Sequence, residues 1–311
     1  FLKFILYFIS INWDNKMLKR GVYAASLSVL NKDLTLNVEA TITHGENLIK
    51  NGCTGVFFMG STGQAQLCSI ESKKELISKI ASHKLRKQFF IGLGVNSLSD
   101  SISLIKYANE YEINKEILIG APAYYRNNSD EGVFNFFKRI ISECPKVKIV
   151  IYNFEKLFHY KFSVEAVTNL VNTFPKQVVA VKDSSYNLYE NLKIKDFLVF
   201  PGSEAKLLKG LEHGCAGCIS AVTNVTHSLA RKVFDDFENK IPQTKNEQLI
   251  RVRETFDSYN LISALHSYHS IKDENYKNIL PPLTLLSEEK KNELIEKLNK
   301  LKFTIEKNLA A

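Results

Sequence analysis

A lysine follows a run of small and β-branched residues in the segment VVAVKDSS, which covers residues 178–185. Such a run is typical of a strand that is buried on both faces, and lysine is almost never fully buried unless it is paired. Two interpretations are open. Lys182 either extends to solvent and pairs with Asp183, or its amine is partly desolvated, which favours the neutral form that attacks ketones and forms Schiff bases.

Two other short stretches could complete such chemistry. Tyr152 ends the apolar run KIVIYN, and its phenol could carry protons during Schiff-base formation if that run lies beside the lysine strand. The alternative is a packed aromatic ring with its hydroxyl in water. Ser61 and Thr62, in the sequence GSTG, offer two hydroxyls and exposed backbone N–H groups that suit a small carboxylate or phosphate. The same tetrapeptide is also an ordinary turn.

The elements that must position these residues follow a regular pattern from Met17 onward. Eight apolar runs of strand length alternate with segments of helical spacing. The runs cover residues 21–30, 55–60, 89–94, 116–122, 148–153, 178–183, 197–202 and 217–222. Parallel neighbours need crossover helices, and eight strands close a (β/α)8 barrel of the TIM type. The rival fold, a doubly wound open sheet, lacks its GxGxxG motif after the first strand.

We therefore predict an α/β fold, a (β/α)8 TIM barrel over residues 17–238, followed by a C-terminal helical extension over residues 239–308. Active sites of such barrels lie at the C-terminal ends of the strands. Side chains alternate between faces along a strand, so Lys182 should face the interior together with Val178 and Ala180. The candidate site residues at the predicted strand ends are Ser61, Thr62, Tyr125, Tyr152, Lys182, Ser184, Gly202, Glu204 and Ser220.

Composition argues against several other classes of function. The net charge is +8, but the 34 lysines and 7 arginines are spread along the chain rather than clustered with aromatic residues, so we expect no nucleic-acid binding. Five cysteines, an odd number, favour reduced thiols and a reducing compartment, and we predict a cytoplasmic protein. Cys215 and Cys218 have no second pair and no histidine at metal spacing, so we predict no metal site.

The first segment, FLKFILYFISINWDNK, carries an apolar stretch that is too short to span a bilayer, which needs roughly 20 residues. No small-residue cleavage site follows, and Lys3 interrupts the run, so a signal peptide is a weak interpretation as well. The first methionine is Met17. We expect residues 1–16 to be an extension outside the fold, and we predict no membrane association.

Seven motifs, in order, resemble the Schiff-base aldolase family that contains dihydrodipicolinate synthase, N-acetylneuraminate lyase and the 2-keto-3-deoxy-sugar-acid aldolases. The resemblance covers Met17 to about Lys300 and rests on GSTGQAQLCSIESKKELI, PAYYRNNSDEG, IYNF, VVAVKDSS, FPGSE, GCAGCISAVTNV and PPLTLLSEEKK. Each motif is modest, whereas the ordered set is specific. The resemblance implies a homo-oligomer, a dimer or tetramer, that forms an imine between a lysine and pyruvate without a separate cofactor.

The same resemblance implies a role for each matched residue. Lys182 would be the Schiff-base residue and Tyr152 the proton shuttle. Ser61 and Thr62 would hold the pyruvate carboxylate and join the proton relay. Tyr125 would be a relay tyrosine that synthases of this family contribute across a subunit interface. The pocket for the aldehyde or sugar portion would be lined by Ser184, Gly202, Glu204 and Ser220.

Departures from the family patterns bear on the aldehyde substrate. Synthases usually read YNxPxRT after the fifth strand, and the arginine holds the carboxylate of the aldehyde, whereas Leu157 occupies that position here. The lyases carry leucine-like residues there and read GSTG. We therefore expect a lyase that joins or releases pyruvate and an aldehyde of a 2-keto-3-deoxy sugar acid or N-acetylneuraminate type. Ala205, however, replaces a second acidic residue of the lyases.

Other functions stay open at this point. One is 4-hydroxy-tetrahydrodipicolinate synthase, which condenses pyruvate with aspartate semialdehyde. Another is a dehydratase that uses the same imine, which the identity of its product would distinguish. From a different class, a barrel that binds a keto acid without turnover would place similar residues at the same strand ends.

Overall fold

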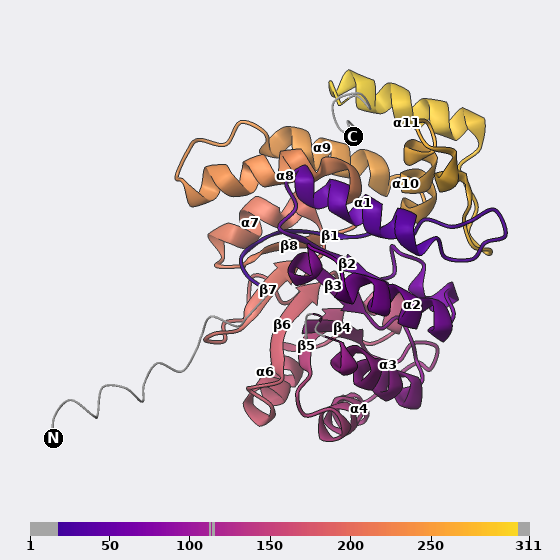
Figure 1. The fold of residues 1–311 in the computed structure, drawn as a ribbon. Coiled ribbons are helices and arrows are strands. Elements are labelled where there is room, and N and C mark those ends of the chain that lie inside the picture. The colour runs from indigo at the N-terminus through magenta and orange to yellow at the C-terminus, as the bar shows by residue number, and fades with distance from the viewer. Residues whose placement is uncertain (1–17, 112, 114–115, 304–311) are drawn as a thin grey trace, which may run out of the picture.

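Eight parallel strands form a nearly closed barrel in the computed structural model, which describes residues 18–111, 113 and 116–303 (Figure 1). The strand order is β7-β6-β5-β4-β3-β2-β1-β8, and the ring comes together where the Ala216 N–H donates to the Val199 carbonyl at 2.8 Å. The strands are β1 (Gly21–Ala25), β2 (Gly55–Phe58), β3 (Phe89–Gly92), β4 (Glu116–Gly120), β5 (Lys148–Asn153), β6 (Val178–Asp183), β7 (Leu198–Pro201) and β8 (Gly217–Ser220). The predicted barrel is confirmed, and each strand lies within its predicted run.

Helices return the chain from one strand to the next. They are α1 (Val38–Lys50), α2 (Ile70–Ala81), α3 (Leu98–Glu110), α4 (Asp130–Glu143), α5 (Glu155–Phe158), α6 (Val164–Thr173), α7 (Leu207–Glu212) and α8 (Thr223–Glu238), with short 3-10 turns η2 (Ala65–Leu67), η3 (Arg86–Gln88) and η4 (Glu204–Lys206). Serine side chains accept a backbone N–H at the start of α2, α3, α4 and α6, which satisfies a donor that the helix leaves free.

The connection from β6 to β7 differs from the others. Residues 184–197, all within the described chain, join these strands without a helix. The buried Asp183 carboxylate organises this segment by accepting four N–H groups at 2.8 to 3.0 Å, from the backbone of Tyr186, Leu188 and Tyr189 and from the Asn153 side chain. Asp183 is thus engaged with the loop, and the interpretation in which it pairs with Lys182 does not describe the structure.

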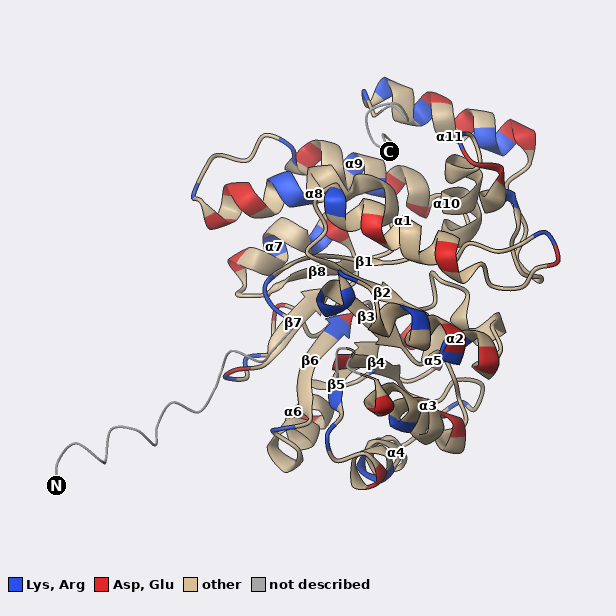
Figure 2. Ribbon diagram, viewed as in Figure 1, with Lys and Arg blue, Asp and Glu red and all other residues tan. Residues whose placement is uncertain are grey.

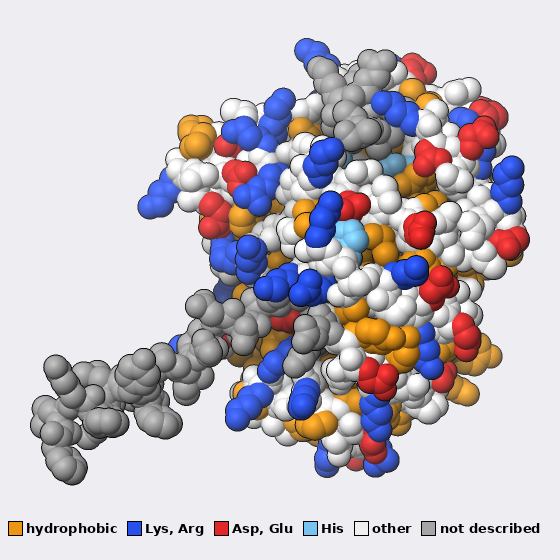
Figure 3. All heavy atoms as spheres, viewed as in Figure 1, with side chains coloured by type: hydrophobic (Ala, Val, Ile, Leu, Met, Phe, Trp, Pro, Cys, Tyr) orange, Lys and Arg blue, Asp and Glu red, His pale blue; other side chains and the backbone are white. Residues whose placement is uncertain are grey.

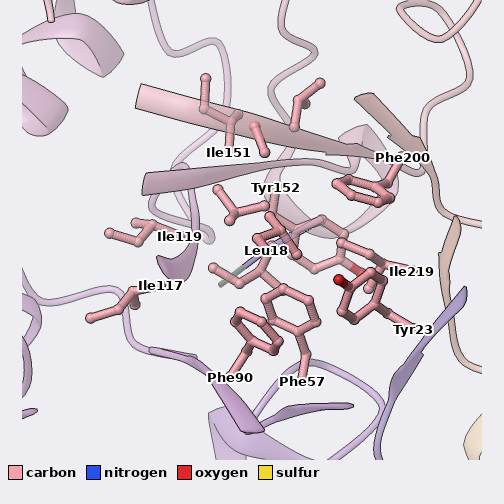
Figure 4. Packing of buried hydrophobic residues seen from close by; sticks show 14 of the residues in the cluster. Leu18, Tyr23, Phe57, Phe90, Ile117, Ile119, Ile151, Tyr152, Phe200 and Ile219 are labelled. Atoms are coloured by element: carbon pink, nitrogen blue, oxygen red, sulfur yellow. The ribbon is translucent and has the colours of Figure 1, made fainter. Parts of the chain in front are cut away.

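Aromatic and aliphatic side chains pack together in the buried core of the barrel (Figure 4). The Tyr23 ring lies edge-on to the rings of Phe57, Phe90 and Phe200, with centroid distances of 5.9, 5.7 and 5.6 Å. Because these rings come from four different strands, they identify the face that points inward. The interior is a packed core rather than a channel, and a side chain near the end of a strand lies on top of it.

Three further helices, α9 (Asn246–Asp257), α10 (Leu261–His269) and α11 (Glu288–Lys300), follow the barrel, with η5 (Glu274–Lys277) between the last two. They lie on the side of α1 and α8 (Figure 1). A second apolar cluster joins them to α8 and to the segment after β1, through Leu27, Val29, Val225, Val252, Phe256, Leu265 and Leu294. The predicted extension is therefore helical within the described residues, while residues 1–16 lie outside them.

Charged side chains are distributed over many helices and loops (Figure 2). On the face shown in Figure 3, basic and acidic side chains are interspersed. Within the described ranges, no helix combines the length and the apolar character that a membrane crossing requires.

Candidate active site

The side chains of Lys182 and Tyr152 meet where β5 and β6 end. The two residues are paired in register on neighbouring strands, and Lys182 also lies beside Phe200, which faces the barrel interior. The Lys182 Nζ atom is 4.3 Å from the centroid of the Tyr152 ring. Lys182 is 3% exposed and Tyr152 is 5% exposed. The lysine therefore lies inside the rim, over the face of an aromatic ring.

A hydrogen bond connects Tyr152 to the turn after β2. Its hydroxyl is 3.1 Å from Ser61 Oγ, and either oxygen can donate. Thr62, the next residue of the turn, is buried. A cavity of about 30 Å³, which has room for at least one water molecule, is lined by Ser61, Tyr152 and residues at the ends of β3 and β4. Lys182, Tyr152 and Ser61 thus form one cluster, in which the Tyr152 hydroxyl and Ser61 Oγ can exchange a proton.

Ser184 and Gly202 lie against each other at the ends of β6 and β7. A Cβ at Gly202 would come within 2.0 Å of Ser184 Oγ, so the serine side chain occupies the space that any other residue would need. The Gly202 N–H donates to the Asp183 carbonyl at 2.7 Å, and the Ser184 N–H donates to the Asn153 carbonyl at 2.8 Å. These bonds tie the ends of β5, β6 and β7 together and leave both residues partly exposed at the rim.

The side chains of Glu204 and Ser220 bind each other and are not exposed at the rim. Both are fully buried. The Ser220 hydroxyl donates to Glu204 Oε2, Thr226 Oγ1 donates to Oε1 at 2.9 Å, and Arg253 Nη1 of α9 donates to Oε2 at 3.0 Å and to the Ser220 oxygen at 2.9 Å. Ser220 is paired with Ala24, one residue along from the inward Tyr23, so its side chain faces away from the barrel interior.

The geometry at the rim can be compared with known proteins. The sequence model of the Dihydrodipicolinate synthetase family matches residues 18–301, which is nearly the whole chain. The chain belongs to this family. The membership confirms the predicted resemblance and the predicted class of enzyme, a lyase of the Schiff-base aldolase type.

Relatives with different named activities are similar to this member of the Dihydrodipicolinate synthetase family. A 2-dehydro-3-deoxy-D-gluconate/2-dehydro-3-deoxy-phosphogluconate aldolase of Picrophilus torridus is 27% identical over 73% of this chain and 86% of its own. A 4-hydroxy-tetrahydrodipicolinate synthase of Bacillus subtilis is 29% identical over 65% and 70%. The crystal structure of dihydrodipicolinate synthase from Agrobacterium tumefaciens has a TM-score of 0.82 at 25% identity, covering 91% of this chain and 99% of that one.

Tyr125 is exposed, whereas Lys182 and Tyr152 are buried. It follows β4 in a loop where Tyr124 has a left-handed backbone, with φ of 85°. The two rings lie edge-on with centroids 5.4 Å apart, and they are the most exposed of the large apolar side chains in the described residues, at 82% for Tyr124 and 73% for Tyr125. A paired aromatic surface of this kind is typical of an interaction site.

The sequence patterns did not predict three residues around the site, which are Arg253, Gln64 and His266. Arg253 sits in α9, and the signal for it was its helical spacing from Leu249 and Phe256, which places an arginine on a buried apolar face. Gln64 follows the GSTG turn and is buried, and His266 of α10 contacts it. No local pattern pointed to the last contact, because the two residues are 202 positions apart.

The cysteines of the described residues are unpaired, and no group of metal ligands is found there. All five cysteines are free thiols, and Cys215 Sγ donates to the Tyr189 carbonyl at 3.1 Å. Among the residues that the structure describes, no three histidine, cysteine or acidic side chains converge as a metal ion would require.

Proposed function

We propose that this protein is a pyruvate-dependent aldolase in which Lys182 forms the Schiff base. The observation that carries the proposal is the buried Lys182 amine over the Tyr152 ring, with the Tyr152 hydroxyl bound to Ser61. Family membership supports it, as does the position of all three residues at the C-terminal ends of barrel strands, where active sites of this architecture lie.

The proposed reaction begins with attack of the neutral Lys182 amine on the keto carbon of pyruvate. Loss of water leaves an imine, which withdraws electrons so that a methyl proton departs and an enamine forms. The enamine carbon attacks the aldehyde carbon, the aldehyde oxygen takes up a proton, and water then releases the product. The Tyr152 hydroxyl, with Ser61 as its partner, gives and receives the protons. The imine itself is the electron sink, so no separate cofactor enters the reaction.

The carboxylate of pyruvate is placed at the turn after β2. Ser61 and Thr62 supply hydroxyls there, and the turn is closed by N–H bonds from Gly63 and Ala65 to the Gly60 carbonyl at 3.1 and 3.3 Å. A tight turn of this kind, with hydroxyls and backbone N–H groups close together, suits an anion. Thr62 would join the proton relay through its hydroxyl.

The aldehyde partner is proposed to be a hydroxylated, sugar-acid-type aldehyde. Leu157 stands where the synthases carry an arginine, and its side chain is 40% exposed. The guanidinium of Arg253 is paired with Glu204 and Asp257. Ser184 and Ser185 bring hydroxyls to the rim, and Ser185 Oγ accepts the Glu155 N–H at 2.8 Å. The hydroxyls of Ser184 and Ser185, together with the leucine at position 157, suit a polyhydroxylated chain better than the carboxylate of a semialdehyde.

A second candidate is condensation of pyruvate with aspartate semialdehyde. The observation that favours it is the name shared by several relatives, such as the 4-hydroxy-tetrahydrodipicolinate synthases of Bacillus subtilis and Methanosphaera stadtmanae. A substrate panel separates the two candidates. Pyruvate release from a 2-keto-3-deoxy sugar acid or from N-acetylneuraminate supports the first, and pyruvate consumption that requires aspartate semialdehyde supports the second.

Trapping with borohydride tests the core of the proposal. Incubation with pyruvate and borohydride should add the reduced pyruvate adduct to Lys182, as located by peptide mass spectrometry, and Lys182→Ala should abolish the labelling. Exchange of pyruvate methyl protons with deuterated water, followed by NMR, distinguishes turnover through an enamine from simple binding of a keto acid. Labelling that persists in Lys182→Ala, or an unmodified Lys182, would contradict the assignment.

A further inference from the structure

Gln64 closes the turn that carries Ser61 and Thr62, and its side chain is buried. Its backbone is left-handed, with φ of 56°, a conformation that is uncommon for residues other than glycine. The Gln64 N–H donates to the Ser61 carbonyl at 3.0 Å, and the residue is 2% exposed. The shape of the turn therefore depends on what holds the Gln64 side chain in place.

Two groups from the C-terminal helical region hold that side chain. Gln64 Oε1 accepts the Leu280 N–H at 2.8 Å, and Gln64 Nε2 is 3.2 Å from Nε2 of His266 in α10. His266 is fully buried. Its other ring nitrogen, Nδ1, is 3.0 Å from the carbonyl oxygen of Tyr276. The loop after β2 and the helices that follow the barrel are thus joined through one amide.

The tautomer of His266 follows from these partners. A carbonyl can only accept, so Nδ1 carries the proton, and Nε2 of the neutral ring accepts an N–H of the Gln64 amide. Reversing the amide would place its NH2 group against the Leu280 N–H, so that two donors would face each other. A protonated ring would likewise turn a donor toward the amide. The neutral ring with its proton on Nδ1 is the arrangement that satisfies every group.

The surroundings of His266 keep the ring neutral. Burial lowers the pKa of His266 to about 4. The titratable side chains around it are His44 of α1, His269 of α10 and Tyr276 of η5. Burial also lowers the pKa of both neighbouring histidines and raises the pKa of Tyr276. The acceptor that Gln64 needs is therefore present at neutral pH.

We propose that His266 is a positioning residue of the active site, which acts through Gln64 to hold the Ser61–Thr62 turn in the shape that receives a carboxylate. The inference rests on the proposed function in its assignment of pyruvate to that turn. Without the His266 acceptor, a buried N–H of Gln64 loses its partner, and the turn loses one of its two side-chain anchors. Binding of the keto acid should weaken, whereas Lys182 and Tyr152 keep their places.

Variants at the two partners test this coupling. His266→Leu should raise the pyruvate concentration for half-maximal borohydride trapping by about tenfold, the scale of one lost hydrogen bond, while the trapping rate at saturation changes by less than about threefold because Lys182 is untouched. His266→Gln places an amide oxygen near the position of Nε2 and should restore most of the pyruvate affinity. Gln64→Leu also removes the acceptor of the Leu280 N–H, so it should raise the half-maximal pyruvate concentration at least as much as His266→Leu, and the double variant should be no worse than Gln64→Leu alone.

His269→Leu is the matched control. His269 lies on the same helix, is buried to a similar degree, and has an Nε2 atom without a hydrogen-bond partner in the structure. Its removal should leave the half-maximal pyruvate concentration unchanged. An unchanged value in His266→Leu, an equal rise in His269→Leu, or additive effects in the double variant would overturn the proposal.

Hydrogen–deuterium exchange separates this inference from the proposed function. In the unliganded protein, backbone amides of residues 60–67 should exchange faster in His266→Leu than in the wild type or in His269→Leu. If the wild type fails to trap pyruvate at all, the proposed function fails, and this exchange still decides the role of His266. Equal exchange in the two variants would overturn the positioning role even if pyruvate is trapped.

Discussion

The Tyr152 side chain contacts two residues of the site, one through its ring and the other through its hydroxyl. The face of its ring lies 4.3 Å from the Lys182 amine, and its hydroxyl lies 3.1 Å from Ser61 Oγ. The ring also packs edge-on against Phe158, with centroids 5.3 Å apart. Packing therefore depends on the ring, whereas proton transfer depends on the oxygen, and the two contributions can be separated by removing the oxygen alone.

Tyr152→Phe should reduce the exchange of pyruvate methyl protons by about a hundredfold or more, the usual contribution of a positioned acid–base group. The fold should persist because the ring contacts remain. Tyr160→Phe is the control, since it also removes a buried tyrosine hydroxyl, one that donates to Asp130 at 2.7 Å. The exchange rate, followed by NMR, should be unchanged in the control. An equal loss in both variants would contradict the role of Tyr152.

At the scale of elements, α9 is joined to the barrel by a buried ion pair. Glu204, in the turn after β7, is fully buried, and Arg253 of α9 is its partner at 3.0 Å. Arg253 Nε also donates to both Asp257 oxygens at 2.9 Å. A carboxylate buried in this way is strongly destabilising once its cation is removed, because no water replaces the partner. The pair therefore fixes the position of α9 against the ends of β7 and β8.

Arg253→Met should lower the free energy of unfolding by about 3–5 kcal/mol, because it leaves the Glu204 charge buried and unpaired. Adding Glu204→Gln should recover part of the loss, so the double variant should be more stable than the sum of the single effects predicts. Urea denaturation measures all three variants.

The control for Arg253 is Arg251→Met on the same helix. Arg251 is 60% exposed and 4.0 Å from Glu247, and such surface pairs contribute about 0–1 kcal/mol. A comparable destabilisation by Arg251→Met would show that the helix, rather than the buried pair, is sensitive to the substitution.

At the scale of the whole molecule, a group of buried histidines lies between the barrel and the C-terminal helices. His44 Nε2 of α1 is 2.8 Å from Asn224 Oδ1, and its Nδ1 is 2.7 Å from the Tyr276 hydroxyl. Burial lowers the pKa of His44 and of His266 to about 4, whereas an unfolded histidine titrates near 6.5. The folded protein thus binds fewer protons between these values, and its stability falls as the pH drops through this range.

The free energy of unfolding should fall by about 2–3 kcal/mol per buried histidine between pH 7.5 and pH 4.5. In His44→Gln this fall should be smaller by the contribution of one histidine, about 2–3 kcal/mol, because glutamine does not titrate. His159→Asn is the control, since His159 is exposed and asparagine tolerates its left-handed backbone. Urea titrations at several pH values measure the slope, and an unaltered slope in His44→Gln would contradict the assignment.

The exposed tyrosine pair bears on assembly. We propose that Tyr124 and Tyr125 contact a second copy of the chain and that Tyr125 joins the proton relay of that copy. Tyr125→Asp should shift the protein toward monomer in sedimentation velocity, because a charge would be buried at the contact. Tyr125→Phe should preserve the assembly and slow methyl-proton exchange. Ile241→Asp, at another exposed apolar residue, should do neither. A wild-type protein that sediments as a monomer would contradict the proposal.

Local patterns in the sequence were sufficient to predict the barrel. Eight strand runs alternate with helical segments, except between β6 and β7, and alternation along β6 placed Lys182 on the inward face. Such features depend on residues that are close in the sequence and on which face of an element is buried. The local order of apolar and polar residues indicates both. The rim residues Ser61, Tyr152 and Lys182 could be grouped for the same reason, because parallel strands end at one edge.

Contacts between distant segments were decided by the tertiary structure. Glu204 and Ser220 were expected to face the substrate, yet each meets Arg253, 49 and 33 residues away. Gln64 meets His266 across 202 residues. A buried charge or amide must find a partner, but which partner it finds depends on how α9 and α10 pack against the barrel. The sequence by itself determined the strands, the helices and the residues at the rim, and the packing of distant helices determined which polar groups are free to meet a substrate.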